Sequence, residues 1–393
     1  MPDFPQFQYS MKQVVRAGDA LREPIAWEEE RREEILEIFR IANSWRDSHV
    51  YPMTRVRQEI IGKNRSGNLQ GLSVARLKRM SSIQKKLRRI PSKLNQMQDL
   101  GGCRAILPSM RAANALIQAF RDNPLHEFFS ESDYIANPKP GGYRCHHVIY
   151  KFKGAGESEV FNGRRIEVQI RSRLQHSWAT AVEAVGLFLK QDLKAGIGNA
   201  SWLRLLELMS AELAVAEDCP EPQGVPSRSE RVRELRELDR ELRAVGTLEN
   251  LRQAVRFTDT YTTGGDKPRY YRIQYDNRDM QVVVSPHTIP IAGVAETEAV
   301  EQQNTVRGDN RFNTVFVEAD RIEDLKEAFP NYFGDVQMFA ANLRDITRGY
   351  SAKEYTMPPQ QTVPPGPKEV PDMSWFRKPK RWTEPVPKKR QKS

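Results

Sequence analysis

The stretch "RRIEVQIRS" at residues 164–172 limits the fold more than any other part of the chain, because its side chains alternate with a period of two. One side of the predicted strand is apolar and carries Ile166, Val168 and Ile170. The other side is polar and carries Glu167, Gln169 and Arg171. The apolar side must pack on a core, so the strand belongs to a sheet with one covered face. The polar side either meets solvent, which is the commoner case, or forms part of a site.

Further elements around this strand indicate an α+β fold, a small mixed β-sheet flanked by helices. Strands are predicted at 103–108 and 146–152, and the turn-rich segment "KGAGESEVFNGR" joins the second of these to 164–172. Amphipathic patterns predict helices over 26–47, 51–63, 71–90, 110–122, 173–190 and 201–217. The predicted division is N-terminal helices over 1–65 that pack on a domain at 66–217.

A break rich in Pro, Ser and Gly at 217–230 precedes a second, smaller α/β module, predicted over 229–350. It begins with one long helix over 229–257 and continues with the hairpin "YYRIQY-DNRD-MQVVVS", a strand at 313–319 and helices at 321–329 and 334–347. No catalytic constellation is found there. Residues 356–393 are rich in Pro and then in Lys and Arg, which predicts a disordered basic tail.

A formal net charge of +10 favours polyanionic partners, and the positive charge is unevenly spread. Residues 76–93 carry eight cationic side chains and no acid, whereas a solvated helix usually mixes both signs. This segment therefore predicts a multiply charged anion nearby, with a generic basic surface as the alternative. The tail mixes Lys and Arg with aromatic residues, which suits RNA but equally a solubilising segment.

Several classes of protein are disfavoured because the sequence lacks their characteristic features. No apolar run is long enough to span a bilayer, and the first residues do not form a signal peptide, so a cytoplasmic protein without a membrane partner is expected. The three cysteines are scattered, which favours neither disulfides nor zinc. Neither a Walker A motif nor G-x-G-x-x-G is present.

Two carboxylates stand out as candidates for chemistry. Asp99 precedes the first predicted strand, and Glu167 lies on the polar side of the third. Carboxylates beside many cations suit nucleotide chemistry, in which one carboxylate can hold Mg²⁺ and the other can orient and deprotonate a hydroxyl. Lysine and arginine would neutralise the phosphoryl groups.

Four segments in the same order as in a known family give the chain a resemblance to the synthetase domain of the RelA/SpoT alarmone synthetases over roughly residues 40–190. They are "RLKRMSSIQKK", "DLGGCRAI", "DYIANPKPGGYRCHH" and "IEVQIRSRLQHSWATAVE". The resemblance implies a nucleotidyltransferase-like fold and transfer of pyrophosphate from ATP to the 3′-hydroxyl of GDP or GTP, with Mg²⁺ as cofactor. Because no hydrolase domain precedes these segments, synthesis without breakdown of the alarmone is expected.

The resemblance also implies a role for individual residues. Arg76 would stack on adenine, and Lys78, Ser82 and Lys86 would lie at the ATP phosphates. Asp99 and Glu167 would bind the metal, and Glu167 would also activate the 3′-hydroxyl. The remaining site residues would bind the acceptor: Lys139 and His147 its phosphates, Tyr143 its guanine, and Gln169 and Arg171 as support on the same face.

Three departures from the family pattern leave the acceptor open. Gly141 stands where the family often has Asn, Cys145 where it has Ser, and Ala184 where it has His. A toxin-like relative that pyrophosphorylates the 3′ end of tRNA is therefore the alternative, with the basic tail holding RNA. A non-catalytic nucleotide- or RNA-binding regulator is a further alternative, which the intact Asp99 and Glu167 disfavour. Homo-oligomerisation is left open.

Overall fold

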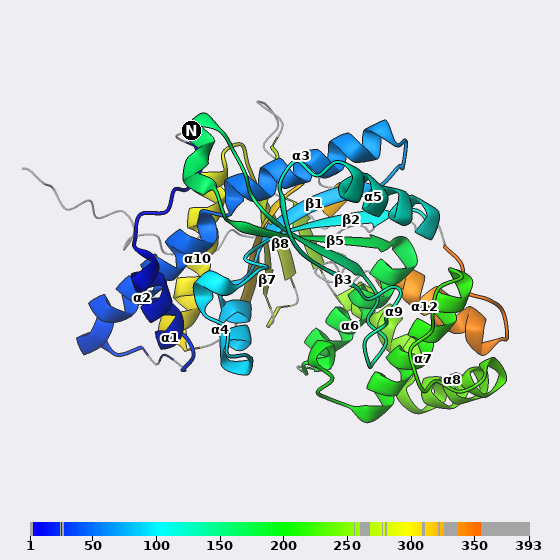
Figure 1. The fold of residues 1–393 in the computed structure, drawn as a ribbon. Helices are drawn as coiled ribbons and strands as arrows, with labels where there is room; N and C mark the ends of the chain where they lie inside the picture. Colours follow the sequence, from blue (N-terminus) through cyan, green and yellow to red (C-terminus); the bar gives the residue numbers. More distant parts are fainter. Residues whose placement is uncertain are drawn as a thin grey trace, which may run out of the picture.

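A nine-stranded mixed sheet forms the centre of the computed structural model (Figure 1), with the strand order β3-β4-β5-β2-β1-β9-β7-β8-β6. The structure describes residues 3–354 apart from 24, 26, 190, 255, 260–267, 277, 280, 309–310, 321–322 and 326–335. Strands β2 and β5 pair in parallel, as do β6 and β8, and the other neighbours are antiparallel. The predicted α+β class with helices on a mixed sheet is confirmed.

Five strands make the first half of the sheet. Their bounds are Leu72–Leu77 for β1, Gly101–Leu107 for β2, Glu127–Asp133 for β3, His146–Lys151 for β4 and Arg165–Ser172 for β5. The apolar side of β5 faces helices α3 (Val50–Ser66) and α5 (Met110–Asp122), and Ile166, Val168 and Ile170 are fully buried there. Burying side chains of this size stabilises the fold by roughly 1.5–3 kcal/mol each. The opposite side of β5, with Glu167, faces away from this core.

Two groups of helices lie on either side of the sheet, to the left and to the right in Figure 1. On one side, α1 (Met11–Ala20), α2 (Arg32–Asp47, preceded by η1, Glu29–Arg31) and α4 (Met80–Arg89) share a core with η2 (Leu94–Gln96). On the other side lie α6 (Arg173–Leu189), η4 (Leu193–Ala195), α7 (Ala200–Ala216), α8 (Arg228–Leu242), α9 (Ala244–Ala254) and α12 (Gln337–Thr347). Another short helix, η3 (Gly156–Phe161), lies in the β4–β5 connection.

The strands of the expected second module continue the same sheet instead of forming a separate one. They are β6 (Arg256–Asp259), β7 (Tyr270–Asp276), β8 (Gln281–His287) and β9 (Phe312–Glu318). Strand β9 joins the halves because it pairs with β7 and also with β1, where Ala75 is opposite Glu318 and Arg76 is opposite Val317. Helix α10 (Pro290–Arg307) packs on β7 and β9.

The prediction of one helix over 71–90 is wrong in its first half, which forms β1 before α4 begins at Met80. The apolar positions of "LSVARL" fit a helix and a strand alike in so short a window. Pairing with β2 on one side and β9 on the other decides for the strand, because both edges of its backbone are then hydrogen-bonded. The second pairing involves residues far away in the sequence, so no local pattern reveals it.

The single helix predicted over 229–257 is also wrong, because the chain breaks at Arg243, whose φ of 47° is left-handed. Helices α8 and α9 lie on either side of the break, and β6 follows. The sequence reading did not foresee α1, β3 and α10. The hairpin β7–β8, strand β9 and the last helix were foreseen, whereas the helix at 321–329 falls mostly outside the described residues and the tail at 356–393 entirely so.

Candidate active site

The polar side of β5 is the floor of the candidate site, and the strand register extends it across the sheet. In the parallel pairing with β2, Glu167 is opposite Gly102 and Gln169 is opposite Arg104. In the antiparallel pairing with β4, His147 is opposite Gln169. Gly102 is in turn opposite Arg76 of β1. The predicted site residues Arg76, His147, Glu167, Gln169 and Arg171 therefore share one sheet face.

Glu167 is held by two neighbours on this face. Its Oε1 lies 3.0 Å from His147 Nδ1, and its Oε2 accepts a hydrogen bond of 2.7 Å from Gln169 Nε2. Burial alone would raise the pKa of Glu167, but the His147 charge and the two hydrogen bonds outweigh burial and lower the pKa. Glu167 is therefore ionised at neutral pH and fixed in orientation.

His147 connects Glu167 to the loop before β4. Its Nε2 lies 2.7 Å from the Tyr143 hydroxyl, so the contacts run Glu167–His147–Tyr143. Burial lowers the pKa of His147, but the interaction with Cys145 and, after it, that with Glu167 raise the pKa to about 10. A charged imidazole donates from both nitrogens, to the carboxylate and to the hydroxyl oxygen.

Asp99 forms a second ionic cluster beside the first. Lys78 Nζ lies 2.9 Å from its Oδ2, and Lys86 Nζ lies 2.9 Å from its Oδ1. Burial raises the pKa of Asp99, and the charge of Glu167 also raises it, but the two ammonium groups outweigh both and lower it. Lys78 follows β1 and Lys86 lies on α4, so Asp99 fixes the helix to the strand end. Ser82 lies half-buried on the same helix.

The loop before β4 contains a tight turn that its Pro and Gly residues make possible. Gly142 N donates to Lys139 O across Pro140 and Gly141, and Gly141 has a φ of 83°, as a type II turn requires. The Lys139 ammonium lies 4.0 Å from the centre of the Tyr134 ring and 5.5 Å from that of Tyr143. The turn thus presents one cation and two aromatic faces to the site.

Arg144 does not join this group, although it belongs to the same loop. Its Nη1 lies 2.9 Å from Glu217 Oε2, and its Nε donates to Ser210 Oγ at 3.3 Å. The side chain is buried against α7 and serves to attach the loop. Gly142 approaches the same helix so closely that a Cβ atom there would lie 2.6 Å from the Ser210 Cβ.

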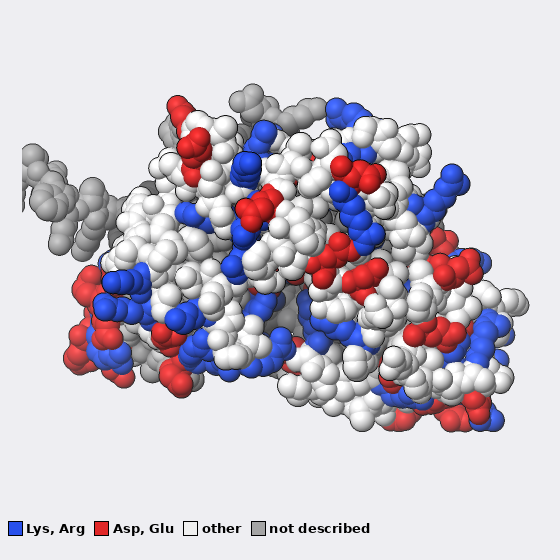
Figure 2. Space-filling view, in the orientation of Figure 1, with Lys and Arg blue, Asp and Glu red and all other residues white. Residues whose placement is uncertain are grey.

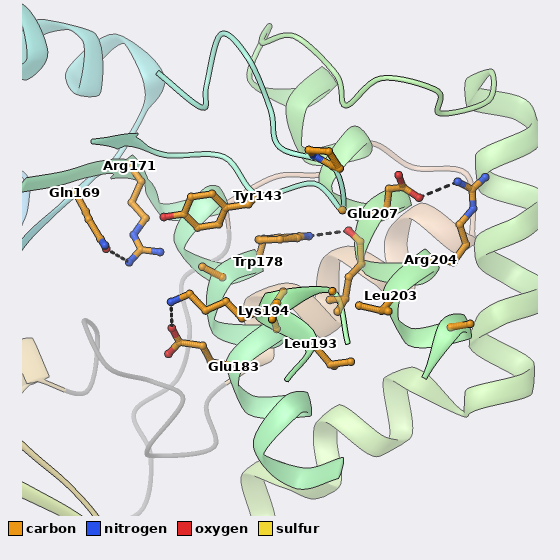
Figure 3. Close-up of a pocket in the computed structure, with 18 of the residues that line it drawn as sticks. Tyr143, Gln169, Arg171, Trp178, Glu183, Leu193, Lys194, Leu203, Arg204 and Glu207 are labelled. Atoms are coloured by element: carbon orange, nitrogen blue, oxygen red, sulfur yellow. Dashed lines mark hydrogen bonds and ion pairs between the residues drawn. The ribbon is translucent and has the colours of Figure 1, made fainter. Parts of the chain in front are cut away.

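A cavity of about 580 Å³ opens beside Tyr143 (Figure 3). Gln169 and Arg171 of the floor reach its edge, and α6, η4 and α7 form its far wall. The wall combines aromatic, apolar and charged side chains: Trp178, Val182, Glu183, Leu193, Lys194, Leu203, Arg204 and Glu207. Figure 2 shows a hollow on this face with Lys and Arg on both of its sides.

Two residues of the cavity were missed by the sequence reading, which named their segments but not their roles. Arg104 lies on the floor, and burial together with the charges of Arg171 and Arg76 lowers its pKa. Glu183 pairs with Lys194 at 3.2 Å, and although burial raises its pKa, Lys194, Arg76 and Arg104 lower it. The alternation in "CRAIL" could have placed Arg104 on the same side as Glu167.

Asp99 and Glu167 fit a magnesium ion by the chemistry of their donors. Both carboxylates are ionised and close enough for the charge of one to affect the other. Mg²⁺ is usually held by one or two carboxylates, with water and substrate phosphates as the other ligands. Within the described ranges, no group of three or more His, Cys, Asp or Glu residues could hold a metal alone.

The described helices include none that is long and apolar enough to cross a membrane.

Residues 75–191 match the family model described as "Region found in RelA / SpoT proteins". The chain is 26% identical to the GTP pyrophosphokinase of Escherichia coli K12 over 145 residues, which are 35% of this chain and 18% of that protein. It is 29% identical to the GTP pyrophosphokinase YjbM of Bacillus subtilis over 158 residues, 38% of this chain and 70% of that protein. The chain thus spans less than a fifth of the length of the Escherichia coli relative.

Solved structures with a similar arrangement include a GTP pyrophosphokinase family protein from Streptococcus pneumoniae. That similarity has a TM-score of 0.37 and 19% identity over 56% of this chain and 98% of the other. The small alarmone synthetase 1 of Bacillus subtilis, bound to its product pppGpp, gives a TM-score of 0.37 and 18% identity over 48% of this chain and 94% of that one.

Proposed function

We propose that this chain, which carries a RelA/SpoT domain over residues 75–191, transfers pyrophosphate from ATP to the 3′-hydroxyl of GDP or GTP. The observation that carries the proposal is that two carboxylate clusters lie close together, one on the sheet face and one just before β2. Asp99 is bound by Lys78 and Lys86, and Glu167 by His147 and Gln169. Cations therefore lie on both sides of a pair of carboxylates, as a reaction between two polyphosphates requires.

On this proposal the cluster at Asp99 receives ATP. Lys78, Lys86 and Ser82 lie at the phosphates, and Arg76 stacks on the adenine. Asp99 and Glu167 would hold Mg²⁺, which would neutralise phosphate charge. Asp99 keeps both lysines in place until ATP arrives.

The acceptor lies on the other side of Glu167. Tyr143 stacks on the base beside the cavity, and Lys139 and His147 meet the acceptor phosphates, with Gln169 and Arg171 in support. The 3′-oxygen forms a bond to the β-phosphorus of ATP, the bond between that phosphorus and the α,β-bridging oxygen breaks, and AMP leaves. The hydroxyl proton passes to Glu167 or solvent. The lowered pKa of Glu167 suits a carboxylate that orients this hydroxyl more than one that acts as a strong base.

The test is to incubate the full chain with ATP labelled in its β- and γ-phosphates and with GDP, GTP or deacylated tRNA in separate reactions. Label is expected in a guanosine nucleotide. Label found only in tRNA would overturn this acceptor and support the toxin-like alternative, and no transfer to any acceptor would support the non-catalytic one. Cytoplasmic location remains a prediction, RNA binding by the tail belongs to the alternative function, and homo-oligomerisation is left open.

A further inference from the structure

We infer that Glu301, on α10 in the second half of the chain, is a positioning residue for the lysines that the proposed function assigns to the ATP phosphates. The inference rests on that proposed function and on contacts around the start of α4. Glu301 Oε1 accepts a hydrogen bond of 2.8 Å from the backbone N of Met80, the first residue of α4, which lies 221 residues earlier in the chain.

The start of α4 needs such a partner because the helix carries no cap of its own. Its N-cap residue is Arg79, whose side chain makes no capping hydrogen bond. The first N–H groups of a helix have no partner inside the helix, and an acidic group close to them is favourable. Glu301 thus supplies, from a distant helix, an acceptor for the first N–H group of α4, which a side chain at position 79 does not reach in the usual cap.

Glu301 is itself fixed by a buried cation. Its Oε2 lies 2.7 Å from Arg46 Nη1, and the Arg46 side chain is only 2% exposed. Arg46 also lies 3.0 Å from Asp47 and 3.7 Å from Glu298, so three carboxylates surround one guanidinium. With its other oxygen held in this way, the Glu301 carboxylate has one orientation toward α4.

A second contact from the same half of the chain holds the residue before α4. Arg79 Nη1 donates to Asn313 Oδ1 of β9 at 3.2 Å. Just before this point β1 pairs with β9 at Ala75 and Arg76. Residues on both sides of Lys78 are therefore attached to β9 or α10.

These attachments determine where both lysines lie. Lys78 lies between β1 and Arg79, and Lys86 lies in α4, whose direction depends on how the helix begins. The two ammonium groups meet at Asp99, each at 2.9 Å, so a shift of the helix start would separate them. On this inference α10 and β9 complete the ATP side of the site.

Glu301→Ala removes the contact, and Glu301→Gln keeps an oxygen that can accept from Met80. Glu296→Ala is the matched control, because Glu296 lies on the same helix but pairs with Arg272 and His287 instead of with α4. The full-length variants are compared by amide hydrogen exchange of residues 80–89, by binding of the non-hydrolysable ATP analogue AMPCPP, and by KM and kcat.

Glu301→Ala is expected to speed exchange in 80–89 and to weaken AMPCPP binding and raise KM for ATP about fivefold, with kcat and the acceptor KM nearly unchanged. Glu301→Gln should keep most of the AMPCPP affinity of the wild type. Glu296→Ala should resemble the wild type in hydrogen exchange, AMPCPP binding and kinetic constants. Unchanged exchange and binding in Glu301→Ala, or an equal effect of Glu296→Ala, would overturn the inference.

If Glu301→Ala does not fold, Asn313→Ala serves in its place, because it removes the contact to Arg79. It is expected to weaken AMPCPP binding and raise KM for ATP by a smaller factor, again with kcat and the acceptor KM nearly unchanged. Unchanged AMPCPP binding in that variant would overturn the inference. The exchange measurement needs no nucleotide. If the wild type transfers nothing, the proposed function fails, and the exchange of 80–89 still decides whether Glu301 holds the helix.

Discussion

Arg57 and Glu318 form an ion pair of 3.3 Å in which neither side chain has any exposed surface, and this pair joins α3 to β9. Glu318 also accepts from the Thr54 hydroxyl at 2.7 Å and from Arg269 at 3.1 Å. The first and last parts of the described fold therefore share a buried polar centre. A buried charge whose partner is removed is costly, because it has lost water without gaining a counterion.

Glu318→Ala is expected to lower the free energy of unfolding by about 3–5 kcal/mol, because it leaves Arg57 buried with less compensation. Urea unfolding of the full chain measures this. Asp320→Ala is the matched control, since Asp320 pairs with the same guanidinium at 2.9 Å but is 54% exposed, and we expect a cost below about 1 kcal/mol. Similar costs for the two variants would contradict the role given to burial.

Glu167→Gln is expected to lower transfer at least about 100-fold while the fold is kept, because a neutral amide of the same shape lacks the negative charge that holds the metal ion and orients the hydroxyl. Transfer of labelled pyrophosphate measures the effect. Glu30→Gln, on an exposed carboxylate far from the site, should leave the rate unchanged. Normal transfer by Glu167→Gln would remove Glu167 from the reaction.

The His147–Glu167 contact predicts a dependence of stability on pH. The pKa of His147 is raised to about 10 in the fold, from about 6.5 in an unfolded chain. The stabilisation from this shift is therefore complete below the unfolded pKa and is lost as the pH rises through the folded pKa. Glu167 stays ionised throughout this window because its pKa is lowered.

The difference in unfolding free energy between the wild type and His147→Gln should accordingly shrink as the pH rises from 7 to above 10, by an amount on the order of 2 kcal/mol. Urea midpoints across this range measure it. His126→Gln should show no such loss, because burial lowers the pKa of His126 and its effect has the opposite sign. A difference for His147→Gln that stays constant with pH would mean that the imidazole is neutral in the fold.

Neighbouring lysines on α4 allow a test of the ATP side. Lys86 pairs with Asp99, whereas Lys85 is exposed. Lys86→Met is expected to raise KM for ATP about tenfold, because a charge-assisted contact to phosphate is lost, and Lys85→Met should change it less than about twofold. Steady-state kinetics with varied ATP decide this. Equal effects would indicate that only the general positive charge of the helix matters.

The Tyr143 ring and its hydroxyl can be separated by two variants. Tyr143→Ala is expected to raise the acceptor KM about tenfold or more through the loss of stacking, with KM for ATP unchanged. Tyr143→Phe keeps the ring but loses the contact to His147 at 2.7 Å, and a change of about threefold is expected. If both variants behave alike, the hydroxyl and not the ring face binds the acceptor.

The floor of the site could be predicted because it depends on a local pattern. The alternation of Ile166, Glu167 and Val168 is enough to place the carboxylate opposite the core, and the sheet confirms it. The turn at Gly141 likewise follows from turn chemistry between near neighbours. Local residues and a family pattern therefore brought most of the site together.

Features that depend on distant partners could not be predicted in the same way. The local pattern predicts a helix where β1 lies, because the pairing with β9 that favours a strand involves residues far away in the chain. The cap of α4 was hidden because Glu301 lies 221 residues from Met80. The Arg144 side chain pairs with Glu217, which lies 73 residues later in the chain, so no local spacing predicts the contact.

The position of β9 between β1 and β7 also has a consequence for folding during synthesis of the chain. Contacts between residues far apart in the chain form late, because the entropic cost of closing a long loop comes before the contacts can offset it. One edge of β1 must stay unpaired until the chain has been made as far as Glu318. A growing chain that has already produced Asp99 and Glu167 would thus still lack a settled ATP side. Under the proposed function, transfer from ATP would therefore begin only near the completion of this fold.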